Sequence, residues 1–352
     1  MNFKILFLYS EIADYFLSCL KALVQEHRVE VHLVRWPVHK EAPFQFSIPD
    51  GVQVHEKQDY NRQQLITLAR KFGPDLIFCT GWMDKDYLAV VRTFKKTVPV
   101  VVGIDNPWMG SMKQQVARLL APFTLQRLFT HAFVAGSPQE RYALKLGFKT
   151  DHVLLGYYSA DVARFQTAYH AARPAKEKLF PKRIIYVGRY IPHKGIQDLW
   201  KAFIELQKEQ PNEWELWCLG TGPLEENAAQ HPKLKHFGFV QPQQMLEFIS
   251  QTGVFVLPSH FEPWGVVVHE FAAAGYPLLC SDKIGAATAF LQILGNGYSF
   301  EAGDVGGLKE VLRKVYSLSD HELLHMGDKS VELALHNTPS IWAAKLMGLV
   351  QE

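Results

Sequence analysis

The sequence predicts an α/β protein made of two Rossmann-like, doubly wound lobes that face each other across a cleft. Short apolar runs alternate with helical patterns along almost the whole chain, which is typical of parallel sheets covered by helices. The chain has 352 residues, which is long for one compact domain and enough for two that each bury a core. A composition of 48% hydrophobic and 20% charged residues excludes a disordered chain.

The first lobe is expected over residues 1–168. A strand at residues 4–9 opens it, a helical pattern follows to about residue 27, and further strands are predicted at 29–36, 76–79, 98–103 and 131–135. The opening apolar run is too short for a signal peptide and leads directly into Glu11 and Asp14, so we interpret it as a strand. No run approaches the roughly 20 apolar residues of a membrane span. Four scattered cysteines without a CxxC pair indicate buried free thiols and a cytoplasmic protein.

The second lobe is expected over residues 184–338, after a linker at 169–183 that contains two prolines and five basic residues. Strands are predicted at 183–187, 215–219, 234–237, 254–257 and 277–280. Residues 340–350 have the pattern of an amphipathic helix, and we expect segment 339–352 to return to the first lobe. Ligands of doubly wound sheets bind at the carboxyl ends of strands, which predicts a site in the cleft.

The most specific pattern is PSHFEPWGVVVHEFAAAGYP, which places Glu262 and Glu270 eight positions apart. It follows a strand that ends near Leu257 and opens a helix around Gly265. Such a loop directs backbone N–H groups at an anion, and a glycine lets a diphosphate approach closely. The two carboxylates can accept hydrogen bonds from sugar and ribose hydroxyls. Acidic residues are also common in first helical turns, but the apolar residues around both favour a site.

A second pattern, RIIYVGRYIPHKGIQDLWKAF, places two cations after a strand. The strand ends at Val187 and Gly188, and Arg189 and Lys194 follow before the next helix. An arginine fork and a lysine point charge at this position can neutralise a leaving diphosphate. Basic loop residues are often only solvated, so this interpretation depends on the neighbouring carboxylate pattern.

These two segments resemble the hallmark motifs of retaining glycosyltransferase family 4, which has the GT-B fold: an E-x7-E motif preceded by a GR-x(n)-KG motif. LGTGPLEEN at 219–227, which contains Gly220, resembles the family's glycine turn. FGFV at 237–240, which contains Phe239, resembles the segment that brackets the nucleobase. Residues 133–148 and 161–165 resemble the end of the family's first lobe.

The resemblance implies a hexosyltransferase-like enzyme that moves a sugar, with retention, from a nucleotide-diphosphate sugar to an unidentified acceptor. UDP is the nucleotide that the family suggests, and the nucleotide-sugar is a co-substrate, so no cofactor is expected. Arg189 and Lys194 would hold the diphosphate, Glu270 the ribose and Glu262 the sugar hydroxyls. The remaining donor contacts would come from Gly188, Gly220, Phe239, Trp264, Gly265, Val266 and Val267. A GT-B epimerase, a sugar phosphorylase or a non-catalytic nucleotide-sugar-binding partner remain the alternatives.

Two departures concern the first lobe. YSEIADYF after the first strand lacks the glycines that many family members place against the phosphates. Asp105 stands where family members commonly have a histidine near the donor sugar. Its carboxylate can bind a sugar hydroxyl or assist the acceptor, but Asp-Asn-Pro is also an ordinary turn sequence.

No metal is expected. Asp84-Lys85-Asp86 matches the DxD pattern of metal-dependent glycosyltransferases, yet it stands where a helix begins, which favours helix capping. The 15 histidines lack HExxH spacing, so a catalytic zinc is not predicted.

The charge distribution bears on partners. Residues 1–165 carry 20 Lys/Arg against 15 Asp/Glu, and the remainder carries 17 against 20. This excess is too small for a nucleic-acid footprint but fits an anionic acceptor or peripheral contact with the inner membrane face. An uneven surface without a partner is an equal alternative. The stretch 113–129 mixes Lys113, Arg118 and Arg127 with leucines and phenylalanines, as a membrane-surface helix does. Because Pro122 interrupts it, a core-facing helix with a basic outer side is favoured.

Overall fold

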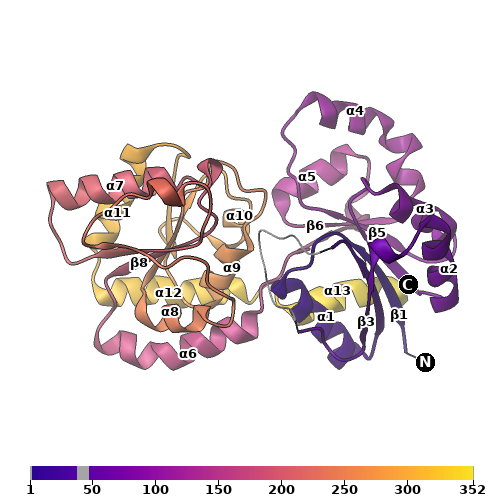
Figure 1. Cartoon of the computed structure of the whole chain (residues 1–352), viewed down its shortest axis with the longest axis horizontal. Coiled ribbons are helices and arrows are strands. Elements are labelled where there is room, and N and C mark those ends of the chain that lie inside the picture. Colours follow the sequence, from indigo (N-terminus) through magenta and orange to yellow (C-terminus); the bar gives the residue numbers. More distant parts are fainter. Residues whose placement is uncertain (1, 38–46, 352) are drawn as a thin grey trace. The chain divides into compact units, whose positions relative to one another are not determined.

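The computed structural model describes residues 2–37 and 47–351, and they form two compact units (Figure 1). The first unit comprises residues 1–161 and 337–352, and the second comprises residues 162–336. Each unit contains a fully parallel sheet with helices on both faces, as the alternation of apolar runs and helical patterns predicts.

The sheet of the first unit has the strand order β3-β2-β1-β4-β5-β6-β7 within the described residues. Its strands are β1 (Lys4–Tyr9), β2 (Glu30–Arg35), β3 (Val52–Glu56), β4 (Leu76–Thr80), β5 (Val100–Ile104), β6 (His131–Val134) and β7 (Val153–Leu155). The helices are α1 (Asp14–His27), α2 (Arg62–Phe72), α3 (Lys85–Phe94), α4 (Met112–Leu120), α5 (Ser137–Lys145) and α13 (Pro339–Gln351).

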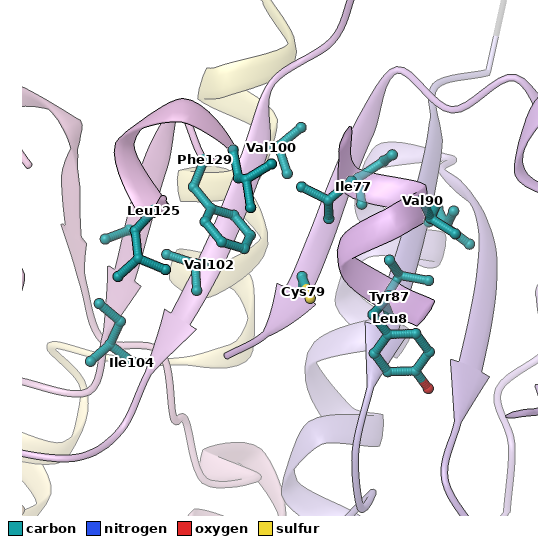
Figure 2. Packing of buried hydrophobic residues seen from close by; sticks show 14 of the residues in the cluster. Leu8, Ile77, Cys79, Tyr87, Val90, Val100, Val102, Ile104, Leu125 and Phe129 are labelled. Carbon is teal, nitrogen blue, oxygen red and sulfur yellow. The ribbon is translucent and has the colours of Figure 1, made fainter. Parts of the chain in front are cut away.

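Both faces of this sheet are buried. Alternate residues of one strand enter different cores, so Leu6 and Leu8 pack on one face while Ile5 and Phe7 pack on the other. Figure 2 shows the first of these cores, in which strand residues such as Val102 lie against Phe129 and Leu125. Strands buried on both faces read as continuous apolar runs, which is why the sequence predicted them.

Helix α13 completes the second of these cores. Trp342 and Leu346 are fully buried against β1 and α1, and the Trp342 indole donates to the Tyr157 carbonyl at 2.8 Å. The Asn337 side chain donates to the Tyr158 carbonyl at 2.8 Å where the chain re-enters the unit. The helix that the sequence predicted at residues 340–350 therefore belongs to the first unit.

The sheet of the second unit has the order β10-β9-β8-β11-β12-β13 within the described residues. Its strands are β8 (Arg183–Val187), β9 (Glu215–Leu219), β10 (Leu234–His236), β11 (Val254–Leu257), β12 (Leu278–Ser281) and β13 (Gly297–Phe300). Its helices are α6 (Val162–Lys178), α7 (Ile196–Glu209), α8 (Met245–Gln251), α9 (Val266–Ala273), α10 (Ala287–Phe290), α11 (Val305–Tyr316) and α12 (Asp320–Ala334).

The linker predicted at 169–183 is instead largely helix α6, which packs on α8, α9 and α12. The prolines and basic residues suggested an irregular segment, but Pro174 is accommodated inside the helix. Arg173 is paired with Asp328 of α12, and Lys182, just after the helix, is paired with Asp320 at 2.6 Å. Contacts with a distant helix thus explain the charges that resembled a solvated linker. The chain enters the second unit at Val162.

Two other expectations concern burial. All four cysteines are buried and free, as predicted. None of the described helices combines the length and apolar character that crossing a membrane requires.

Candidate functional site

The carboxyl ends of β8 and β11 mark the point where the second sheet changes direction. From β8 the chain moves to β9 on one side, and β11 later pairs with β8 on the other. Ligands of such sheets bind at this switch point. The loops 188–195 and 258–265 follow these two strands, and they contain most of the residues that the sequence singled out.

Backbone contacts hold the two loops together. The His260 N–H donates to the His193 carbonyl at 2.8 Å. Gly195, with φ 67°, lies so close to the second loop that a Cβ there would be 2.1 Å from the Pro258 carbonyl oxygen. No other residue fits this approach, so the glycine after Lys194 fixes the spacing of the two loops.

The structure brings Lys194 and Glu262 together as an ion pair. Both side chains are largely buried, with 18% and 14% of their surface exposed. The Ser259 hydroxyl also reaches the Glu262 carboxylate, at 3.4 Å. The Glu262 backbone N–H donates to the Lys283 carbonyl at 3.1 Å, which anchors the loop to the segment after β12. Lys194 and Glu262 therefore neutralise each other in this structure, although the sequence predicted that they contact different parts of a ligand.

Arg189 has a different environment. Its side chain is exposed, and it makes no hydrogen bond or ion pair with the rest of the described chain. Its carbonyl accepts a hydrogen bond from the Tyr186 hydroxyl at 3.0 Å, which fixes the backbone. Burial raises the pKa of that hydroxyl far above its usual value, so Tyr186 remains a donor. The guanidinium is thus a positive charge at the end of β8 that is available to an anion.

Helices α7 and α9 begin at this edge of the sheet without a side-chain cap. Their N-cap residues, Gly195 and Gly265, have φ values of 67° and 90°. Val266 and Val267, the half-buried first residues of α9, follow the Glu262 loop. Uncapped helix N-termini carry unsatisfied N–H groups and a partial positive charge that favour anions.

Gly188 and Gly220 meet at the ends of β8 and β9. A Cβ on Gly220 would be 1.9 Å from the Gly188 carbonyl oxygen, and the φ of Gly220 is 138°. The Gly220 N–H donates to the Gly238 carbonyl at 2.7 Å, and Phe239, the next residue, is exposed. Gly188, Gly220 and the segment before Phe239 therefore form one continuous backbone edge next to Arg189.

Helix α9 carries Glu270, the second carboxylate of the pattern that begins at Glu262. Glu270 is half-buried on this helix, and its neighbour His269 is fully buried, stacked on Phe290 with ring centroids 4.0 Å apart. His269 donates to the Ala334 carbonyl, and burial lowers its pKa to about 4, so it is neutral near pH 7. Trp264 is also buried against Phe290. Only its backbone is left to contact a ligand.

Sequence reasoning missed one pair at this edge. Asp198, in the first turn of α7, lies 2.5 Å from the Nε2 atom of His260. His260 stands two residues before Glu262, and Asp198 four residues after Lys194. Their closeness to the two motifs was the available signal, and their pairing gives the two loops a further link.

Asp105 belongs to the first unit, whereas the other predicted site residues belong to the second. It follows strand β5, which lies between β4 and β6, and it is half-buried. Its carboxylate accepts hydrogen bonds from the Tyr158 hydroxyl at 3.2 Å and the Asn106 amide at 2.9 Å. Its carbonyl accepts from Gln139 at 2.9 Å. Tyr158, which the sequence did not suggest, is thus the partner of Asp105.

The DxD-like pair has a structural role. The Asp84 carboxylate caps α3 by accepting from the N–H groups of Asp86 and Tyr87 at 2.9 and 3.1 Å, which confirms the helix-capping interpretation. Asp86 is paired with Lys57 and Arg62. Within residues 2–37 and 47–351, no group of three or more His, Cys, Asp or Glu side chains could hold a metal ion.

Comparison with known proteins agrees with this geometry. Residues 170–330, slightly less than half of the chain and nearly all of the second unit, match the family model for glycosyl transferases group 1. Glycogen synthase of Mycobacterium tuberculosis is 34% identical over 260 residues, which cover 70% of this chain and 61% of that protein. The chain thus spans about three-fifths of the length of this relative.

Solved structures define the fold class. HepE from Anabaena, crystallised with UDP and glucose, has a TM-score of 0.71 at 14% identity, covering 99% of this chain and all of that one. Sucrose-phosphate synthase from Thermosynechococcus elongatus has a TM-score of 0.70 at 18% identity, covering 100% and 98%. The chain therefore has the GT-B fold, two Rossmann-like units with parallel sheets.

Proposed function

We propose that this chain is a retaining glycosyltransferase of family 4 that transfers a sugar from a nucleotide-diphosphate sugar to an acceptor. The observation that carries the proposal is the edge of the second sheet between β8 and β11. There Arg189, the Lys194–Glu262 pair and the uncapped N-termini of α7 and α9 gather around one switch point. Positive charge at that place suits a diphosphate. The match of residues 170–330 to glycosyl transferases group 1 supports it.

In the proposed complex, Arg189 and Lys194 bind the diphosphate. Glu262, released from Lys194, accepts hydrogen bonds from sugar hydroxyls, and Glu270 accepts from the ribose. The backbone at Gly188, Gly220 and Phe239 and along 264–267 supplies the remaining donor contacts. We propose UDP as the nucleotide, since the similarly folded HepE was crystallised with UDP and glucose.

The proposed reaction relies on electrostatic stabilisation. Negative charge grows on the diphosphate as the glycosidic bond breaks, and fixed cations and helix N-termini favour that charge without a metal ion. The leaving phosphate accepts the proton of the incoming acceptor hydroxyl on the same face of the sugar, so retention needs no protein nucleophile. The proposed location is the cytoplasm.

The exchange of partners at Lys194 gives this proposal a specific consequence. In the free protein its ammonium is neutralised by Glu262, whereas Arg189 has no such partner among the residues that the structure describes. Donor binding therefore has to break the Lys194–Glu262 ion pair, whereas Arg189 can bind the donor without first losing an ion pair. Removal of Lys194 also leaves Glu262 as a largely buried carboxylate without its cation, which costs stability. Arg189→Ala is therefore the cleaner test of catalysis, and Lys194→Ala requires a stability control.

The test begins with thermal shifts against UDP-, GDP-, ADP- and TDP-sugars, because a donor stabilises the fold by mass action. Turnover is then measured at saturating donor for Arg189→Ala, Lys194→Ala and the double variant. Each single loss is expected to lower turnover roughly 100- to 1,000-fold, with less than multiplicative loss in the double variant. Unchanged turnover with only weaker donor binding would make the cations ground-state anchors and contradict the mechanism.

The same samples separate the alternatives. An epimerase converts the donor's sugar when no acceptor is present, and a non-catalytic partner binds the donor without any turnover. A transferase at most hydrolyses the donor slowly under these conditions, so product analysis after incubation with donor alone distinguishes the three.

A further inference from the structure

Helix α4 presents its apolar side to solvent. Met112, Val116, Leu119 and Leu120 stand at positions i, i+4, i+7 and i+8, which is one face of a helix. Their side chains are 79%, 50%, 74% and 51% exposed. None of the nine residues of this helix is buried. The core-facing helix that the sequence favoured is therefore wrong for α4, although Leu125, Leu128 and Phe129 further along the same stretch do enter the core.

The face turned toward the protein is small and polar. The Gln114 side chain donates to the Pro107 carbonyl at 2.8 Å and accepts from the Met109 N–H at 2.7 Å. Ala117 packs against the core, and Ala121, just after the helix, is fully buried. Because these contacts fix the rotation of α4, the outward direction of its leucines is built into the fold. Figure 1 shows α4 at the periphery of the first unit, away from the strands.

Neighbouring residues extend the apolar surface and surround it with positive charge. Met109 and Phe123, which flank α4, are also exposed, at 62% and 68%. The Arg127 guanidinium lies 5.7 Å from the Phe123 ring, and Lys113 and Arg118 are exposed on α4 itself. The sequence contains no Asp or Glu between Asp105 and Glu140, so no acidic side chain of this stretch offsets these cations.

We propose that this surface, formed by Met109, Met112, Val116, Leu119, Leu120 and Phe123, is a docking site for an anionic lipid membrane. Apolar residues on one side of a helix with basic residues at its border can insert at the boundary between headgroups and acyl chains. Lysine and arginine near such a surface are attracted by the negative headgroups. For residues 113–129 the sequence left a membrane-surface helix as the alternative to a core-facing one, and the exposed apolar side of α4 supports that alternative.

The charges favour a membrane over a second copy of the chain. Two copies of this surface placed face to face would bring Lys113, Arg118 and Arg127 of one chain near the same cations of the other. Such like-charge contacts oppose self-association. An anionic bilayer offers both the apolar phase that the leucines need and the opposite charge that the cations need.

The experiment is co-sedimentation of the 352-residue chain with vesicles of phosphatidylcholine alone or of phosphatidylcholine and phosphatidylglycerol at about 7:3. Leu119→Glu/Leu120→Glu is expected to weaken binding to anionic vesicles at least about tenfold, because it removes apolar area and adds repulsion. Lys113→Gln/Arg127→Gln should weaken it about fivefold per charge, and only for anionic vesicles. Leu179→Glu is the matched control, since Leu179 is 77% exposed on the second unit, and it should bind as the wild type does.

Absence of wild-type binding, or equal binding by the Leu119/Leu120 variant, would overturn the proposal. A wild-type dimer that the same variant converts to a monomer in light scattering would also overturn it, in favour of a second copy. Thermal melting of each variant shows that it is folded. Nucleotide-sugar thermal shifts without vesicles test the proposed function separately, so failure of one proposal is distinguishable from failure of the other.

Discussion

Replacement of Gly220 by alanine tests how the backbone edge between β8 and β9 is built. The new Cβ would lie 1.9 Å from the Gly188 carbonyl oxygen, far inside contact distance, and no flexible side chain is available to yield. Overpacking of this kind costs about 1–3 kcal/mol. The φ of 138° adds about 1–3 kcal/mol for any residue with a Cβ. The Gly220→Ala chain should therefore lose about 2–6 kcal/mol of unfolding free energy.

Gly303→Ala is the matched control, because Gly303 has φ 83° but no atom within 4 Å of the new Cβ. It should show only the backbone cost, so the difference between the variants isolates the collision with Gly188. Urea denaturation followed by tryptophan fluorescence measures both. Donor affinity should also fall in Gly220→Ala alone, since the collision displaces the segment that carries Arg189. Equal stability of the two variants would refute the reasoning.

Three other predictions concern donor binding, metal dependence and the pH dependence of stability. Glu270→Ala should weaken donor binding by about 1.5–3 kcal/mol while the chain still folds. Wild-type donor affinity of the folded variant in calorimetry would contradict the ribose assignment. Turnover should survive EDTA, and an absolute requirement for Mn²⁺ or Mg²⁺ lost on replacing Asp84 and Asp86 would contradict the metal-free mechanism. Burial lowers the pKa of Lys176 from 10.5 to about 7. Between these values the lysine binds a proton in the unfolded chain but not in the folded one, so its contribution to stability rises with pH. Relative to Lys176→Met the wild type should gain roughly 1 kcal/mol per unit from pH 7.5 to 9, and parallel stability profiles would show that the lysine is not the cause.

The predicted strands were most accurate where both faces of a sheet are covered. The sequence predicted β1, β8, β9 and β11 with the bounds that the structure has, because strands buried on both sides are continuous apolar runs. It missed β3, β7 and β13, all of which lie at the ends of their sheets. An edge strand has neighbours on one side only, so β3 and β13 tolerate polar residues or glycine and lose the apolar signal. Strand β7 is apolar, but its three residues are too few to give a pattern.

The sequence identified residues of the candidate site, but it did not predict which of them contact one another. The spacing of glycines, cations and carboxylates after β8 and β11 identified Lys194 and Glu262 separately, 68 positions apart. Their pairing depends on β11 lying beside β8, which a single sequence does not specify. The same is true of Asp198 with His260. The orientation of α4 was mispredicted for a different reason, since hydrogen bonds of Gln114 to Pro107 and Met109, just before the helix, turn its polar side inward.

The place of α13 in the first unit has a consequence for biosynthesis. During translation, residues 1–161 leave the ribosome first, but the pocket beside Phe7 and Phe16 that receives Trp342 stays open until the whole second unit has been made. The nascent first unit exposes that apolar surface throughout this interval, while the second unit already has every element of its own sheet. The first unit therefore begins to be synthesised before the second but receives its last helix after it. The second unit can finish folding before the first.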